Sequence, residues 1–167
     1  LLTTLSDQTY IGAYVPHNLV LMSDIHRLKY AMYLNNDAYE ALKKMIDAMP
    51  DEIANDFYVK EAYTSFTDLQ YSNPNLAGKD ERQLGNTVSI ASKSIAYHEF
   101  ETSALSQWLE AHSYEYGFTL RYPKRMASST NHVYDAHYYR YVGKKNANKI
   151  YKENSCIEEY NQKETAE

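Results

Sequence analysis

The segment 138–142 combines aromatic and β-branched residues in a short run that Gly143 ends. Such a run is typical of a buried strand, because these side chains pack well on a pleated surface. His137 stands directly before it, at a place where a metal ligand could lie. The rest of the chain must supply the strands and helices that bury this run.

Further strands are predicted at 57–63, 87–95 and 118–122. In the second of these, apolar and small polar residues alternate, which predicts a strand with one buried face. A small strand or a packed loop is expected at 19–22. It lies inside an irregular segment, 1–33, that we expect to wrap the domain rather than to form its core.

Helical spacing of apolar residues predicts a helix from Asp37 to Pro50, with Asp37 as its N-cap and Glu40 three residues on. A second helix is expected over 103–116, where Gly117 ends it. Shorter helices are expected at 64–71 and 146–153. Because strands and helices do not alternate in strict βαβ order, we predict an α+β fold with a mainly antiparallel sheet flanked by helices.

The 167 residues, 44% of them hydrophobic and 23% charged, fit one globular domain. We assign residues 1–160 to this domain and expect 161–167 to form a polar, frayed tail. No apolar run approaches the roughly 20 residues that a membrane-spanning helix needs. A signal sequence is not recognisable in these residues either.

Composition also narrows the class of function. A net charge of −5, with scattered lysines and arginines, argues against a nucleic-acid-binding surface. Cys156 is the only cysteine, so it has no partner for an internal disulfide. The 18 tyrosines suit either half-buried core edges or a surface that binds sugars or peptides.

Several separated motifs carry a family resemblance. They are Ala62-Tyr63-Thr64-Ser65 with Gln70, Glu81 with Gln83-Leu84-Gly85, Tyr116-Gly117-Phe118, Arg121-Tyr122-Pro123-Lys124 and His137-Tyr138-Tyr139-Arg140-Tyr141-Val142-Gly143. In this order they resemble the VanY-type D-alanyl-D-alanine carboxypeptidases and the related L,D-carboxypeptidases, which trim peptidoglycan stem peptides. The resemblance implies the fold of those zinc enzymes and a bacterial, extracytoplasmic, cell-wall-facing location.

The same resemblance implies a zinc site, and there this chain departs from the family. The family takes two ligands from a Ser-x-His-x-x-Gly-x-Ala-x-Asp motif and the third from Glu-Pro-Trp-His, whose glutamate is the general base. The first histidine falls on Arg82 and the aspartate on Ser89. In the second motif the glutamate falls on Tyr134 and the proline on Asp135, which leaves His137 as the remaining ligand.

These departures predict the loss of catalysis. A catalytic zinc needs three protein ligands and an open position, whereas Arg82 brings a permanent positive charge to the site. The phenol of Tyr134 cannot replace a carboxylate base at neutral pH. We therefore expect a pseudoenzyme that binds no zinc. Its expected partner is a peptidoglycan stem peptide or a cell-wall or membrane protein.

Two alternatives remain open at the level of sequence. The first is an active metal-dependent carboxypeptidase with relocated ligands, which would come from His98, Glu99, Glu101, His132, Asp135 and His137. The second is a structural interaction domain whose groove is filled in, with Tyr134 packed into the former metal position.

A remnant of the peptide-binding groove defines the candidate ligand-binding residues. They are Tyr63, Thr64, Ser65, Gln70, Arg82 and His137. Thr64 falls on the arginine of the family's Tyr-Arg-Ser, which helps to hold the substrate. Arg82 is expected either to pair with Asp135 or a bound peptide carboxylate, or to face solvent.

Overall fold

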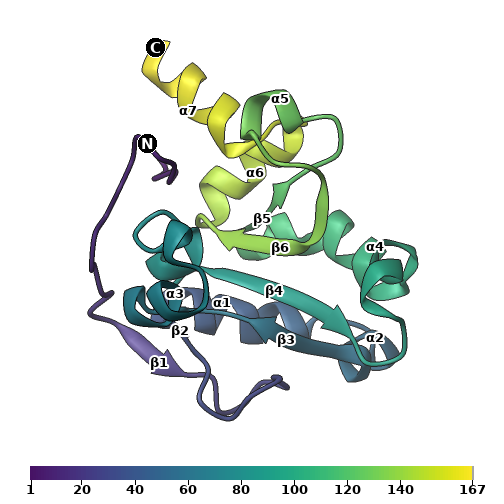
Figure 1. Cartoon of the computed structure of the whole chain (residues 1–167). Coiled ribbons are helices and arrows are strands. Elements are labelled where there is room, and N and C mark those ends of the chain that lie inside the picture. The colour runs from purple at the N-terminus through teal and green to yellow at the C-terminus, as the bar shows by residue number, and fades with distance from the viewer. Residues whose placement is uncertain (167) are drawn as a thin grey trace.

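The computed structural model describes residues 1–166 and has a four-stranded antiparallel sheet at its centre (Figure 1). The strand order is β3-β4-β6-β5, with bounds Phe57–Glu61, Thr87–Ser92, Asp135–Tyr141 and Phe118–Tyr122. A separate two-stranded ribbon pairs β1 (Leu19–Leu21) with β2 (Tyr33–Asn35). The predicted α+β class with an antiparallel sheet is confirmed.

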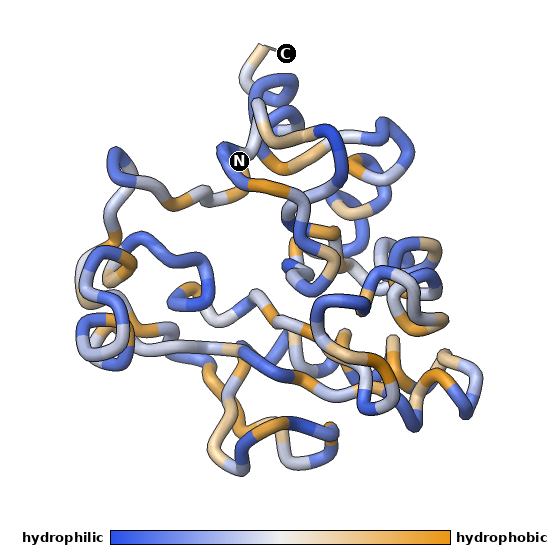
Figure 2. Tube along the Cα trace, turned by 45° about the vertical axis from the view of Figure 1, so that its right-hand side comes forward, coloured by the Kyte–Doolittle hydropathy of each residue, from blue (hydrophilic) through white to orange (hydrophobic). Residues whose placement is uncertain are grey.

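Helices surround this sheet (Figure 1). The α-helices are α1 Asn36–Asp47, α2 Asp51–Asp56, α3 Phe66–Ser72, α4 Ala104–His112, α5 Ala127–Thr130, α6 Lys144–Lys152 and α7 Ile157–Ala166. Short 3-10 turns lie between them: η1 Pro74–Leu76, η2 Glu81–Leu84, η3 Tyr97–Thr102 and η4 Ser113–Tyr116. Among residues 1–166, no helix is long and apolar enough to cross a membrane. Figure 2 shows hydrophobic and hydrophilic residues interleaved along the chain.

The two faces of the sheet differ in chemistry. Strand register places Val88 opposite Tyr139 and Ser89 opposite Tyr138. Because successive side chains of a strand point to opposite faces, Val88 and Tyr139 join the hydrophobic core, which α1 and α4 complete. The opposite face, here called the polar face, carries Glu61, Thr87, Ser89, Arg121, Tyr138 and Arg140.

The strand predictions were correct in position but differ from the structure in strand ends and in burial. The strand over 87–95 is shorter than expected, and all six residues of β4 are buried, not those of one face. Tertiary contacts cover its polar face as well, which local alternation does not reveal. β6 begins at Asp135, so His137 lies inside the strand and not before it.

The helix ends also differ from expectation. Asn35, not Asp37, caps α1, and its side chain accepts a hydrogen bond from the backbone nitrogen of Ala38. The expected helix ends at Asp47, and Pro50 then starts the unpredicted helix α2. Proline suits the first turn of a helix as well as its end, so Pro50 alone did not distinguish the two roles.

The frayed tail expected at 161–167 is wrong as far as Ala166, because α7 continues to that residue. Asn161 fixes it through two hydrogen bonds with the backbone of Leu2, of 2.7 and 2.8 Å. Figure 1 shows the N-terminal segment passing along one side of the molecule to reach this helix. Glu167 lies outside the described residues, and the assignment of 1–160 to one domain stays a prediction.

Candidate functional site

Arg82 is held rigidly at the edge of the polar face. It lies on η2, where the Asp80 carboxylate accepts hydrogen bonds from the backbone nitrogen, Nε and Nη2 of Arg82, at 2.9, 3.0 and 2.7 Å. Its Nη1 is 3.1 Å from Oε1 of Glu61 on β3. The hydrogen bond to Asp80 raises the pKa of Arg82, so its charge is permanent. Two carboxylates thus already compensate this guanidinium.

Tyr138 reaches the same place from β6. Its hydroxyl donates a hydrogen bond to Oε2 of Glu61, the carboxylate that also pairs with Arg82. Burial raises the pKa of this phenol, and the neighbouring Glu61 raises it further. Ser89 is the register partner of both Glu61 and Tyr138, so its side chain lies on the same face. Arg82, Ser89 and Tyr138 therefore converge around Glu61.

His137 is not part of this group, which corrects the expectation that it marks the old ligand position. Its Nδ1 lies 2.7 Å from the carbonyl oxygen of Ile90, and its Nε2 lies 2.9 Å from that of Tyr97. The ring is stacked between Tyr97 and Phe100, with centroids 3.7 and 4.4 Å away. Both ring nitrogens therefore face backbone carbonyl oxygens, and neither is turned toward Arg82.

Replacing His137 with leucine is expected to lower the free energy of unfolding by about 1–3 kcal/mol, because carbonyls that the ring now contacts lose their donor. Urea denaturation measures this loss. His98→Leu is the matched control, since His98 is exposed and a surface change of this kind is usually within about 0.5 kcal/mol. Equal effects of the two substitutions would contradict a structural role for the His137 stack.

Tyr134 and Asp135 also point elsewhere than expected. The Tyr134 hydroxyl lies 3.5 Å from Glu110 on α4, so Tyr134 does not pack beside Arg82. Burial raises its pKa, with Glu110 adding to the effect, so it stays a neutral phenol. Asp135 accepts a hydrogen bond of 2.9 Å from the backbone nitrogen of His137. The expected Arg82–Asp135 pair is therefore wrong, and Asp80 and Glu61 are the partners of Arg82.

The donor set of the polar face does not fit zinc. Arg82 offers no lone pair, Ser89 is a neutral hydroxyl, and the phenol of Tyr138 is engaged with Glu61. Relocated ligands are not found either: within residues 1–166, no three His, Cys, Asp or Glu side chains are grouped so that they could hold a metal ion.

Of the other candidate groove residues, Thr64 contacts η2 and Ser65 caps α3. The backbone nitrogen of Thr64 donates to the carbonyl oxygen of Arg82 at 3.4 Å. Ser65 caps α3 by accepting from the backbone nitrogen of Asp68, and its hydroxyl donates to the Asp68 carboxylate. Tyr63 is half-buried, and burial raises the pKa of its phenol. Gln70 is exposed on α3.

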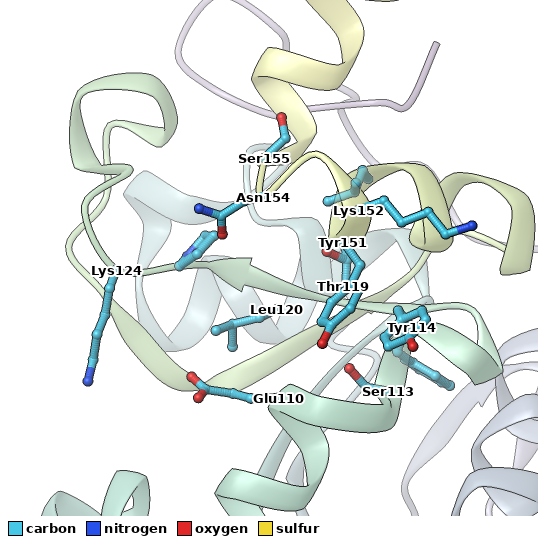
Figure 3. A pocket seen from close by; sticks show the side chains of 13 residues that line it. Glu110, Ser113, Tyr114, Thr119, Leu120, Lys124, Tyr151, Lys152, Asn154 and Ser155 are labelled. Atoms are coloured by element: carbon cyan, nitrogen blue, oxygen red, sulfur yellow. The ribbon is translucent and has the colours of Figure 1, made fainter.

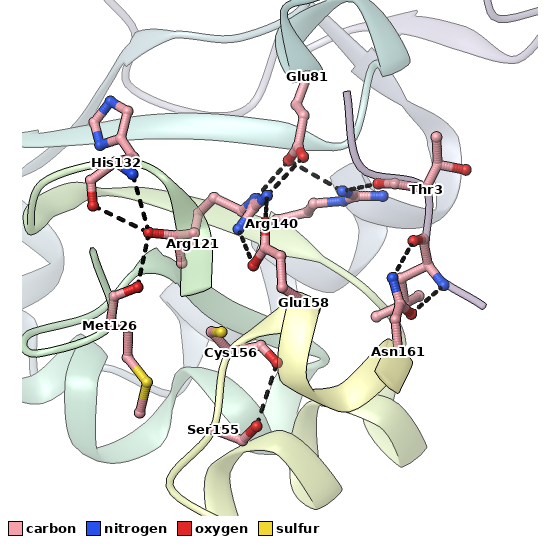
Figure 4. A network of polar contacts seen from close by, with 12 residues as sticks. Thr3, Glu81, Arg121, Met126, His132, Arg140, Ser155, Cys156, Glu158 and Asn161 are labelled. Atoms are coloured by element: carbon pink, nitrogen blue, oxygen red, sulfur yellow. Dashed lines mark hydrogen bonds and ion pairs between the residues drawn. The ribbon is translucent and has the colours of Figure 1, made fainter. Parts of the chain in front are cut away.

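The sequence did not predict a buried ion network that Arg121 and Arg140 form on the polar face. Arg121 donates from Nε and Nη2 to the Glu81 carboxylate, at 2.7 and 2.9 Å, and from both Nη atoms to Glu158 (Figure 4). Arg140 lies 3.0 Å from Glu81 and also donates to the carbonyl oxygen of Thr3. The network joins η2, β5, β6, α7 and the N-terminal segment.

The sequence carried a signal for the place of Tyr138 but none for the ion network. Tyr138 and Arg140 are two residues apart on one strand, so they share a face, and Arg140 is one of the motif residues. Alternation from Arg140 therefore leads to Tyr138 and not to His137. Pairing among Glu81, Arg121 and Glu158 had no local signal, because 37 to 40 residues separate the partners.

Comparison with known proteins agrees with this architecture. Residues 69–144 match the family model of VanY, D-alanyl-D-alanine carboxypeptidase. A putative carboxypeptidase, YodJ of Bacillus subtilis (strain 168), is 28% identical over 91% of this chain and 63% of its own length. A D-alanyl-D-alanine carboxypeptidase of Enterococcus faecalis (strain ATCC 700802 / V583) is 32% identical over 73% of this chain and 44% of its own. The chain thus spans less than two thirds of these relatives.

Solved structures show the same fold over nearly the whole chain. The LD-carboxypeptidase LdcB superposes with a TM-score of 0.81 at 27% identity, covering 91% of this chain and 80% of LdcB. VanYB in complex with D-alanine-D-alanine gives a TM-score of 0.75 at 24% identity, covering 96% of each chain. The fold and the matched residues together show that this chain is similar to the VanY-type D-alanyl-D-alanine carboxypeptidases.

Proposed function

We propose that this chain is a non-hydrolytic VanY-type domain that binds at the cell wall. One observation carries the proposal: where the family motif has a metal-ligating histidine, the Arg82 guanidinium is fixed by Asp80 and Glu61. A dication at this place would meet a permanent positive charge and no imidazole. Ser89 and Tyr138 supply neither a carboxylate nor an imidazole in compensation.

A cell-wall peptide is the ligand that the relatives favour. VanYB was solved with D-alanine-D-alanine, and the LdcB structure concerns peptidoglycan recognition. Tyr122 lies beside Tyr138, with ring centroids 6.3 Å apart, and His132 stacks on Tyr122 at 3.9 Å. This aromatic group supplies flat contact area for a peptide without a metal. We also propose a bacterial, cell-wall-facing location, on the ground of the similarity to LdcB and VanYB.

A second candidate is a pure interaction domain with a filled groove. Its supporting observation is that Asp80 and Glu61 already compensate Arg82, so the guanidinium is not free to bind a peptide carboxylate. In this candidate the ion pairs of Arg82 serve stability alone. The two candidates differ in whether the polar face binds a peptide.

The test combines hydrolysis with binding. Purified protein with added zinc is incubated with a peptide ending in D-Ala-D-Ala, and released D-alanine is measured beside an active VanY-type enzyme. We expect no release above the buffer control, and peptide binding by calorimetry that added zinc does not change. Absence of both release and binding would favour the filled-groove candidate. Release of D-alanine that chelation abolishes would refute the non-hydrolytic proposal.

A further inference from the structure

Separate parts of the chain enclose a polar cavity of about 370 Å³. Residues 5–8 of the N-terminal segment form one wall, which η1 and Lys79 continue. The opposite wall comes from the end of β5, from residues 130–132 at the end of α5, and from Glu158 of α7. The cavity therefore depends on the N-terminal segment being held in place.

The N-terminal wall is a fixed part of the fold. Asp7 pairs with Lys79 at 2.7 Å, and the backbone nitrogen of Ile11 donates to the carbonyl oxygen of Gly78 at 2.9 Å. The ring of Tyr10 lies so close to Gly78 that a Cβ added to this glycine would be 2.1 Å from a ring atom. Binding at this wall does not have to order it first, which lowers the cost of association.

The charges of the lining compensate one another. Asp7 and Lys79 form one ion pair, and Arg121 forms another with Glu158, with Nη2 and Oε1 2.6 Å apart. These four are the Asp, Glu, Lys and Arg side chains of the described lining, and none of them lacks a partner. A charged ligand would lose its hydration without gaining a free counter-charge. The cavity therefore favours a neutral ligand.

Uncharged hydrogen-bonding groups of the lining are available to such a ligand. The side-chain amides of Gln8, Asn75 and Asn131 are exposed and form no hydrogen bond with any described residue, and the Tyr122 hydroxyl forms none either. Each amide offers two donors and an acceptor. Burial raises the pKa of Tyr122 to about 12, so its hydroxyl keeps its proton and can donate.

A flat ring completes the lining. His132 stacks on Tyr122 with centroids 3.9 Å apart and an interplanar angle of 17°. Its Nδ1 lies 2.7 Å from the carbonyl oxygen of Val133, which fixes the orientation of the ring. One ring face is covered by Tyr122, and the exposed His132 can offer the other to the C–H groups of a ligand. Leu5 and Leu76 are the aliphatic residues of the described lining, so the apolar side chains of a peptide would find few partners.

A second cavity, of about 580 Å³ beside β5, differs in character (Figure 3). Tyr114 and Tyr151 stack on each other there with centroids 3.7 Å apart, so each covers a ring face of the other. Two lysines line this cavity beside one glutamate, which does not favour a neutral ligand. Its residues therefore serve as an internal reference in the test below.

We propose that the cavity between the N-terminal segment and His132 binds a neutral saccharide. The amides of Gln8, Asn75 and Asn131 pair with hydroxyl and acetamido groups, and one sugar ring lies against the open face of His132. A saccharide combines many neutral donors and acceptors with C–H faces, which is what this lining can bind. The site adjoins the polar face through Tyr122 and does not depend on peptide binding there.

The test uses the full chain, isotope-labelled, and tri-N-acetylchitotriose as the neutral saccharide. We expect the signals of Asn75, Asn131 and His132 to shift on titration, and those of Tyr151 and Asn154 at the second cavity to stay in place. The fully deacetylated trimer, at a pH where its amines are charged, should bind about tenfold more weakly, because the lining has no carboxylate without a partner.

Variants of the lining sharpen the test. Gln8→Ala combined with Asn75→Ala should weaken binding about tenfold through the lost hydrogen bonds. Both side chains are exposed and lack protein partners, so the fold is unaffected. The matched control combines Asn55→Ala with Gln162→Ala, which removes two exposed amides outside the cavity and should leave affinity unchanged. His132→Ala should weaken binding about fivefold, and His132→Phe, which keeps a flat ring, should restore most of it.

A parallel titration with a sugar-free peptide ending in D-Ala-D-Ala separates this inference from the proposed function. Saccharide binding in the absence of peptide binding supports the inference and counts against the peptide alone. The inference is overturned if the neutral trimer shifts none of the cavity signals, if the charged trimer binds as tightly, or if the two double variants have equal effects.

Discussion

Replacing Arg121 with alanine is expected to lower the free energy of unfolding by about 3–5 kcal/mol, the usual cost of removing one partner of a buried ion pair. The substitution leaves Glu81 without its two hydrogen bonds from Arg121 and removes the link to Glu158. Glu81 is 6% exposed at its side chain, so water cannot replace the guanidinium. Arg140 remains in place, but it contacts only one oxygen of Glu81.

Urea denaturation measures this loss, and an exposed ion pair gives the control. Lys43 pairs with Glu40 on the surface of α1, and Lys43→Ala is expected to cost no more than about 0.5 kcal/mol. A second variant, Glu81→Gln, tests the other partner and should also be strongly destabilising. If Arg121→Ala cost about as little as Lys43→Ala, the network would not hold η2, β5 and α7 together.

The same network predicts a dependence on pH. Burial alone would raise the pKa of Glu81, but the charges of Arg140 and Arg121 outweigh burial and lower it below its ordinary value of 4.5. A carboxylate whose folded pKa is lowered contributes stability above its unfolded pKa. That contribution disappears as the pH falls through the folded value. We therefore expect Glu81→Gln to remove part of the acid-induced loss of stability between about pH 5 and pH 2.

The sequence predicted the sheet better than it predicted the contacts within the site. Each strand of the central sheet was located, because short aromatic and β-branched runs end at glycine, proline or polar residues. Helix α2 was not predicted, because proline occurs both directly before helices and directly after them, and Pro50 was taken as the end of the preceding helix. The continuation of α7 was missed because its polar residues carry little periodicity, and Asn161 is fixed by Leu2 from the other end of the chain.

Of the residues expected at the site, Arg82 and Ser89 lie on the side of the sheet that carries Glu61, whereas His137 does not contact this group. Histidine is a common metal ligand, yet the His137 ring contacts two carbonyl oxygens and two aromatic rings. Neighbours in the sequence, His137 and Tyr138, have different surroundings in the strand, and only the pairing of β6 with β4 shows which one meets Glu61. No local sequence pattern predicts the register between β6 and β4.

A zinc site should therefore return only when the third position is rebuilt at Tyr138. The triple variant Arg82→His, Ser89→Asp, Tyr138→His places two imidazoles and a carboxylate where three side chains now converge on the polar face. In the native protein Glu61 contacts both Arg82 and Tyr138. In the variant it remains beside the new ligands, where its carboxylate can accept a hydrogen bond from the imidazole nitrogen that does not bind the metal. We expect this variant to retain about one zinc ion per chain after dialysis.

The matched control is the double variant Arg82→His, Ser89→Asp, which keeps the native His137. Both variants lose the ion pairs of Arg82 with Asp80 and Glu61, so the cost in stability that follows from these pairs is common to the two. Thermal unfolding of both variants checks that they are folded. The double variant should lose its zinc on dialysis, because the nitrogens of His137 are turned to the carbonyl oxygens of Ile90 and Tyr97.

Zinc stoichiometry by elemental analysis of the native protein, the double variant and the triple variant is the most direct test that Arg82, Ser89 and Tyr138 occupy the former metal site. We expect zinc in the triple variant and none in the other two proteins. Stoichiometric zinc in the native protein, or as much zinc in the double variant as in the triple variant, would show that these three residues do not occupy that site.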